Sequence, residues 1–235
     1  MTAGLLPSVC ALCGASACES LCNGCARYLI DTTTRCRQCA LPLDTALQID
    51  PHDATFGICG RCITRRPSFD ATVCVADYAE PADSLAIALK FHGQLALASL
   101  FGSALAGRLL ERQVVAPDLI VPVPLSAARL ASRGYNQAWE MARVFARHIG
   151  RPADAHCLTR TRDTRAQSGL RGLDRWRNMR RAFVVERPDC IRGAHIGLVD
   201  DVMTSGATLE AAARALKQAG AARVTVFVAL RTPSP

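Results

Sequence analysis

Two adjacent carboxylates form the most distinctive chemical feature of this sequence. Asp200 and Asp201 follow an apolar run that begins at residue 196. Because the run is typical of a buried strand, we predict that both carboxylates lie at its carboxyl end, the edge of an open α/β sheet where ligands bind. Paired aspartates can accept hydrogen bonds from a sugar diol or face a hydrated Mg²⁺ ion.

A short loop and then a helix are predicted after the carboxylates. Backbone N–H groups and hydroxyls at such a helix N-terminus would favour an anion. A phosphate at this loop, together with a diol at the carboxylates, would suit a ribose 5-phosphate. The loop residues are Thr204, Ser205, Gly206, Ala207 and Thr208.

A simpler interpretation of these residues is a helix N-cap beside two solvated turn carboxylates. The other common nucleotide-binding patterns are excluded. The chain contains no Gly-Lys dipeptide and no two glycines two positions apart, so it has neither a P-loop nor a dinucleotide-binding fingerprint.

Four Cys-x-x-Cys pairs lie before residue 63 and predict two structural zinc sites, each with four thiolate ligands. One such pair would also fit a redox motif, but four repeats of the same spacing favour metal. Sequential pairing assigns one ion to Cys10, Cys13, Cys22 and Cys25, and the other to Cys36, Cys39, Cys59 and Cys62.

Two alternatives to this arrangement stay open. A crossed pairing would join the first pair with the third and the second with the fourth. Iron–sulfur clusters also accept four cysteines. Two isolated cysteines, Cys74 and Cys157, are interpreted as small buried hydrophobic residues.

The composition indicates a folded protein. Of 235 residues, 50% are apolar and 20% are charged, which allows a core and excludes wholesale disorder. No apolar run approaches the roughly 18 residues that cross a bilayer, and residues 1–13 lack the features of a signal peptide. We therefore expect a cytoplasmic protein without membrane insertion.

Basic residues give the chain a formal net charge of +8. Two zinc–tetrathiolate sites would lower it to about +4. Residues 160–192 hold ten arginines against four acidic residues, a pattern that could track nucleic-acid phosphates. Only Trp176 and Phe183 are aromatic in this segment, so a platform for stacking bases is not visible.

Strand and helix patterns alternate after residue 67. We predict strands over residues 70–79, 119–123, 155–158, 195–199 and 223–230. Helices are predicted over residues 83–91, 95–112, 136–149 and 207–219. This alternation predicts an α/β fold with a mostly parallel sheet covered on both faces. The predicted division is a double zinc ribbon over residues 1–66 and an α/β domain over residues 67–235.

Residues 199–208, Val-Asp-Asp-Val-Met-Thr-Ser-Gly-Ala-Thr, resemble the PRPP-binding motif of type I phosphoribosyltransferases. The chain as a whole resembles the ComF (ComFC/GntX-like) family, which places a cysteine-rich zinc ribbon before such a domain. Ser205 departs from the second threonine of many type I enzymes but keeps the hydroxyl. Further matching segments are residues 121–125 (Val-Pro-Val-Pro-Leu), 133–137 (Arg-Gly-Tyr-Asn-Gln) and 175–183, which includes Arg177 and Asn178.

The resemblance implies roles for these positions. Asp200 and Asp201 would hold the ribose hydroxyls of PRPP, bound with Mg²⁺, and the 204–208 loop would hold its 5-phosphate. Val123 corresponds to the pyrophosphate loop. Arg133 and Arg177 would neutralise the pyrophosphate, which suits the forked guanidinium group. A catalytic domain would displace pyrophosphate at C1 of the sugar, but no segment indicates the acceptor.

The sequence supports two main functional hypotheses. The first is a phosphoribosyltransferase-fold protein that binds PRPP and Mg²⁺ and serves natural competence or the use of external DNA, as the resemblance to ComF proteins implies. The second is a non-catalytic competence factor that binds single-stranded DNA through the zinc ribbon and the basic segment. Other competence proteins would be further partners. A zinc-stapled interaction module ranks last, because it would not need the carboxylates and the loop.

Overall fold

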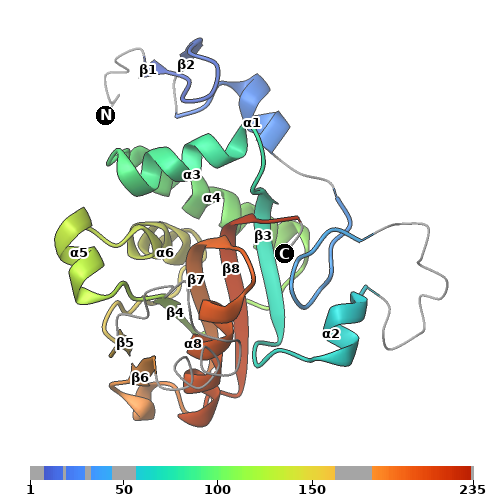
Figure 1. Ribbon diagram of the computed structural model, residues 1–235, viewed down its shortest axis with the longest axis vertical. Coiled ribbons are helices and arrows are strands. Elements are labelled where there is room, and N and C mark those ends of the chain that lie inside the picture. Colours follow the sequence, from blue (N-terminus) through green and yellow to red (C-terminus); the bar gives the residue numbers. More distant parts are fainter. Residues whose placement is uncertain (1–7, 18–19, 30–32, 44–56, 162–181, 234–235) are drawn as a thin grey trace, which may run out of the picture.

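A four-stranded parallel sheet forms the centre of the molecule (Figure 1). The computed structural model describes residues 8–17, 20–29, 33–43, 57–161 and 182–233. The sheet has the order β3-β8-β7-β4, and all neighbouring strands run parallel. Its strands are β3 (Ala71–Asp77), β4 (Leu119–Pro122), β7 (His195–Met203) and β8 (Arg223–Arg231). The predicted α/β class with a parallel sheet is confirmed.

Three helices cover one face of this sheet: α3 (Ala82–Phe91), α4 (Ala96–Glu111) and α6 (Gln137–His148). Helices α4 and α6 pack closely because α4 has a glycine, Gly102, at their contact. A Cβ atom there would lie 2.8 Å from the carbonyl oxygen of Met141 on α6. The predicted helices on this face are confirmed to within one residue at each end.

Helix α8 (Ala207–Gln218) lies on the opposite face and buries Leu209, Ala212, Ala213 and Leu216, one stripe of a helix. Beside it, β5 (Leu158–Arg160) and β6 (Phe183–Val185) form an antiparallel pair. The predicted strand over residues 155–158 is therefore misplaced, since β5 shares only Leu158 with it. Residues 152–154 make only an isolated parallel bridge to β4 at Ala153, and the β5–β6 pair stays outside the parallel sheet.

Two shorter helical segments lie between the elements named so far, one after β4 and one after β6. Helix α5 (Ala127–Arg133) follows β4, and the hydroxyl of Ser126 caps it by accepting from the N–H of Arg129. A 3₁₀ turn, η2 (Pro188–Cys190), follows β6. Among the described helices, no segment is long and apolar enough to cross a membrane.

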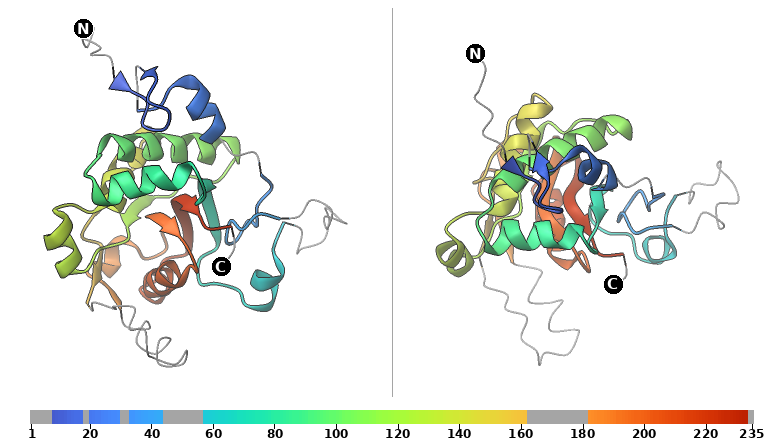
Figure 2. Two further views of the ribbon diagram at one scale, coloured as in Figure 1. Left: turned by 45° about the horizontal axis from the view of Figure 1, so that its top comes forward. Right: turned by 90° about the horizontal axis from the view of Figure 1, so that it is seen from above.

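The cysteine-rich region forms two separate modules, one against helices α3 and α4 and the other beside the edge strand β3 (Figure 2). The first cysteine module contains β1 (Ser8–Val9), β2 (Ser16–Ala17) and α1 (Asn23–Leu29), and it shares an apolar cluster with α3 and α4. The second cysteine module comprises residues 33–43 and 57–64 and includes α2 (Gly60–Thr64). Its cysteines join the apolar cluster of α8.

The second cysteine module also covers the edge strand β3. The N–H of Thr72 donates to the carbonyl oxygen of Arg37 at 3.0 Å, and the Thr72 hydroxyl donates to that of Gln38 at 2.6 Å. These bonds occupy polar groups that an open sheet edge would expose. The division at residue 66 stays a prediction.

Candidate functional site

The carboxylate pair lies within β7, near the carboxyl end of the parallel sheet. We predicted that the strand ends at residue 199, but β7 continues to Met203 because β8 runs beside it as far as Arg231. Asp200 is half-buried and Asp201 is buried. One oxygen of Asp200 accepts the N–H of Asp201 at 2.9 Å, and Oδ1 of Asp201 accepts the N–H of Val202 at 2.8 Å.

A lysine from α3 reaches these carboxylates. Nζ of Lys90 lies 2.8 Å from Oδ2 of Asp201. In the described part of the chain this oxygen accepts no directed hydrogen bond, so the ammonium group is its main polar neighbour. No role was predicted for Lys90. The sequence feature that could have pointed to Lys90 is the scarcity of lysine, since Lys90 and Lys217 are the only lysines in an arginine-rich chain.

The electrostatics of the carboxylate pair are unfavourable for two full charges. Burial, and then the neighbouring charge of Asp201, raise the pKa of Asp200 well above its usual range. The Lys90 ammonium acts in the opposite direction on this pKa. A site of this kind favours a cation or hydroxyl donors that can stabilise the ionised form.

The 204–208 loop connects β7 to α8. Gly206 is the N-cap of α8 and has φ of +78°, a left-handed conformation that glycine adopts without strain. The side chains of Thr204 and Ser205 are exposed. Within the described residues, the backbone N–H groups of Thr204, Ser205 and Gly206 donate to no protein acceptor. Three successive free N–H groups beside a helix N-terminus form an environment that favours an anion.

Two arginines that the sequence analysis did not select hold the carbonyl groups of this loop. Nη1 of Arg231 donates to the carbonyl oxygens of Met203 at 2.9 Å and Thr204 at 2.6 Å. Nη2 of Arg61 donates to the carbonyl oxygen of Ser205 at 3.2 Å. No local sequence signal distinguishes either arginine, because both contacts join segments far apart in the chain.

Val123 lies directly after β4, and its N–H donates to the carbonyl oxygen of Val199 at 2.8 Å. This bond places it next to the carboxylate end of β7. Its own carbonyl oxygen accepts Nδ2 of Asn136 at 3.1 Å. The structure thus brings Val123 beside the strand that carries the carboxylates.

Arg133 is the last residue of α5, and its guanidinium lies close to the last residue of α3. Its guanidinium carbon lies 5.5 Å from the ring centre of Phe91, the residue after Lys90, and Nη1 donates to Oε1 of Gln137 at 2.5 Å. Its pyrophosphate role stays a prediction. Arg177 and the rest of residues 162–181, including Arg175 and Trp176, lie outside the described residues.

The eight predicted metal ligands form two groups of four with the sequential pairing, not the crossed one. Within each group the sulfur atoms lie within 4.8 Å of one another. Two of these separations are 3.8 Å for Cys13–Cys22 and 3.6 Å for Cys39–Cys59. A tetrahedral zinc with bonds of about 2.3 Å sets its sulfurs about 3.8 Å apart, whereas a disulfide needs about 2.05 Å. The sulfur positions therefore fit zinc.

The thiols within each group affect one another's ionisation. The backbone N–H of Cys22 is the main cause that lowers the pKa of Cys10 to about 6. In the second group, the thiol of Cys39 lowers the pKa of Cys36, and Cys36 in turn raises the pKa of Cys39 to about 12. Without a metal, the four thiols of a group therefore differ in how readily they ionise. A bound dication would stabilise the thiolate form of all four.

Cys74 and Cys157, two of the four cysteines outside the Cys-x-x-Cys pairs, are buried, as predicted. Burial raises the pKa of both, for Cys157 to about 11, which keeps the thiols protonated and unreactive.

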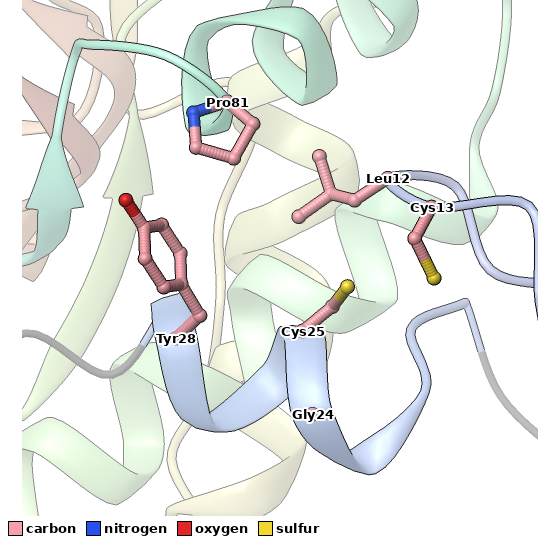
Figure 3. A pocket seen from close by; sticks show the side chains of 6 residues that line it. All are labelled: Leu12, Cys13, Gly24, Cys25, Tyr28 and Pro81. Carbon is pink, nitrogen blue, oxygen red and sulfur yellow. The ribbon is translucent and has the colours of Figure 1, made fainter.

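A separate hollow of about 350 Å³ lies between the first cysteine module and the start of α3 (Figure 3). It has few polar groups to orient a small ligand, and none of its lining residues belongs to β7 or to the 204–208 loop. The residues that line it are Leu12, Cys13, Gly24, Cys25, Tyr28 and Pro81.

Comparisons with known proteins agree with this geometry. The phosphoribosyl transferase domain family matches residues 98–235, which include the carboxylates and the loop. The DNA utilization protein YhgH of Salmonella typhi is 34% identical over 97% of this chain and 98% of its own length. This chain belongs to the ComF family of phosphoribosyltransferase-domain proteins.

Two further ComF-family relatives have names that refer to competence. Competence protein F of Haemophilus influenzae is 31% identical over 89% of each chain. Competence protein ComFC of Bacillus subtilis is 33% identical over 61% of this chain and 57% of its own length. The match to YhgH covers the cysteine-rich region together with the ComF-family phosphoribosyltransferase domain.

Proposed function

We propose that this ComF-family chain binds PRPP at the carboxyl end of β7. The observation that carries the proposal is that the carboxylate pair lies two residues before three successive backbone N–H groups that have no protein acceptor in the described residues. Asp200 and Asp201 would accept the ribose hydroxyls. The N–H groups of the 204–208 loop would donate to the 5-phosphate, as they do at other helix N-termini.

Mg²⁺ fits this donor set. Carboxylate oxygens are ligands that Mg²⁺ prefers, and the raised pKa of Asp200 indicates a carboxylate whose ionised form lacks sufficient positive charge nearby. When bound with PRPP, the ion would neutralise the pyrophosphate. Lys90 already neutralises Asp201 through its 2.8 Å contact. Arg133, at the end of α5, would add positive charge for the pyrophosphate.

Zinc in both cysteine groups is part of the same proposal, because the sulfur separations match a tetrahedral tetrathiolate site. The names of the relatives support a role for this chain in natural competence or in the use of external DNA. We name no acceptor for the phosphoribosyl group.

The decisive experiment is a thermal-shift titration with PRPP and Mg²⁺. At a PRPP concentration of 100 Kd, binding should stabilise the folded protein by about 2.7 kcal/mol, which raises Tm by roughly 5–10 °C for a chain of this size. The double variant Asp200→Asn/Asp201→Asn should lose this shift. The matched control is Asp118→Asn, whose carboxylate accepts the N–H of His195 at the opposite end of β7 and should keep the shift.

A shift that needs Mg²⁺ and disappears only in the double variant supports PRPP binding. If the zinc-loaded, folded wild type shows no shift, the proposal fails and single-stranded DNA binding becomes the leading function. That alternative predicts an affinity for single strands that falls steeply with salt. It should also weaken when Arg175, Arg177, Arg180 and Arg181 are replaced together, and unchanged binding in that variant would exclude the basic cluster.

A further inference from the structure

Three consecutive carbonyl groups of the proposed phosphate site point at arginine side chains. Arg231 donates to Met203 and Thr204, and Arg61 donates to Ser205. In a planar trans peptide, the C=O and the N–H of the same peptide unit point in opposite directions. The N–H groups that follow these carbonyls belong to residues 204, 205 and 206, and they must therefore point away from the arginines.

These are the same three N–H groups that meet no protein acceptor in the described chain. The two arginines thus bind the carbonyl side of the loop, and the N–H groups of residues 204–206 lie on its other side. Each guanidinium also polarises the peptides that it contacts, because it draws electron density toward the carbonyl oxygen. The N–H groups on the other side become stronger donors to an anion.

Both arginines are tied to the second cysteine module. Arg231 has only 1% of its surface exposed, and its Nε donates to the carbonyl oxygen of Cys39 at 2.9 Å. Within the described residues it has no carboxylate partner and is held by backbone carbonyls alone. Arg61 lies between Cys59 and Cys62, two ligands of the same group. The shape of this cysteine group therefore sets the positions of both guanidinium groups.

We propose that the second cysteine module is a working part of the phosphate site, in which Arg61 and Arg231 act as positioning residues for the 204–208 loop. This inference rests on the proposed function of that loop. It implies that metal bound by Cys36, Cys39, Cys59 and Cys62 and a phosphate monoester bound at the loop strengthen each other's binding, since such coupling is reciprocal.

The first cysteine module provides an internal comparison. It packs against α3 and α4, and none of its described residues makes a hydrogen bond to the 204–208 loop. Its α1 carries Arg27, an exposed arginine two residues after Cys25. If the coupling depends on the arginine contacts, only the second group should respond to ligand.

The first test compares Arg61→Gln with Arg27→Gln, both loaded with zinc, by calorimetric titration with ribose 5-phosphate. This probe contains the phosphate but no pyrophosphate. Because Arg61 contributes one exposed hydrogen bond, its loss should weaken binding about threefold to tenfold, while Arg27→Gln should bind like the wild type. Arg61→Lys keeps a charged donor and should recover part of the affinity. Inorganic pyrophosphate should bind all variants equally.

The second test measures metal release directly. Chelator is added to the wild-type protein with and without saturating ribose 5-phosphate, and the release of each zinc is followed by absorbance. The proposal expects the ligand to slow the release of one zinc and leave the other unchanged. A variant without the first metal group, Cys13→Ser/Cys22→Ser, should retain the protected zinc.

The outcomes separate this inference from the function on which it rests. If the wild type binds neither PRPP nor ribose 5-phosphate, the proposed function fails, and the inference fails with it. If the wild type binds but Arg61→Gln and Arg27→Gln have equal affinity, only the coupling is overturned. Equal effects of ligand on the release of both zincs, or no effect on either, would also overturn it.

Discussion

Replacing Gly206 with alanine tests the geometry of the 204–208 loop most directly. Its φ of +78° costs an alanine about 1–2 kcal/mol. The added Cβ would lie 2.7 Å from Cε of Met203, the flexible end of a side chain that can shift. We therefore expect a stability loss of about 1–2 kcal/mol, which lowers Tm by roughly 2–8 °C in a chain of this size.

The effect on ligand should be larger than the effect on stability. An alanine at this position favours a different φ, which turns the N–H of residue 206 away from the phosphate. A hydrogen bond to a charged group contributes about 1.5–3 kcal/mol, so ribose 5-phosphate should bind roughly 10- to 150-fold more weakly. Calorimetric titration measures this change.

Gly150 provides the matched control. It follows α6 with φ of +64°, and no atom would lie within 4 Å of an added Cβ. Gly150→Ala should lower Tm by a similar amount and leave the affinity for ribose 5-phosphate unchanged. If Gly206→Ala binds the sugar phosphate as well as Gly150→Ala does, the N–H groups of this loop do not hold the phosphate, and the reasoning is refuted.

Three other predictions concern stability and metal. The raised pKa of Asp200 means that the folded state retains a proton that the unfolded chain has released, so stability falls as pH rises above about 4. Asp200→Asn should remove this dependence and raise Tm at neutral pH. If the Tm of this variant follows the same course as the wild-type Tm from pH 4 to pH 8, the prediction is contradicted. Gly102→Ala should cost about 1–3 kcal/mol, because its Cβ would approach the Met141 carbonyl. Gly107→Ala, on the same helix with free space, should stabilise by up to about 1 kcal/mol in denaturant titrations. Native mass spectrometry should count two zincs per chain, and removing them should lower Tm.

The regular elements could be predicted because their signals are local. Helices α3, α4, α6 and α8 have apolar stripes, and the central strand β8 is rich in β-branched residues. The cysteine spacing and the Asp200–Asp201 pair are also local patterns. Such features depend on neighbours in sequence, which a single chain displays in full.

The features that the sequence did not predict share one physical cause: each depends on a partner that is distant in the sequence. Aspartate is a poor strand former, so β7 was predicted to stop before Asp200, but pairing with β8 carries it to Met203. The position of β5 was missed because β6, its partner, lies more than twenty residues away. Lys90 and Arg231 acquire their roles only when folding brings them to β7 and to the loop.

The two cysteine modules connect to the proposed ligand site through different elements. The first packs on α3, the helix that carries Lys90 to Asp201 and Phe91 to Arg133. The second holds the loop through Arg61 and Arg231. Because each module shares an apolar cluster with the sheet, neither acts as a detached ribbon. The second module therefore reaches the proposed ligand site through direct hydrogen bonds to the loop, whereas the first reaches it only through α3.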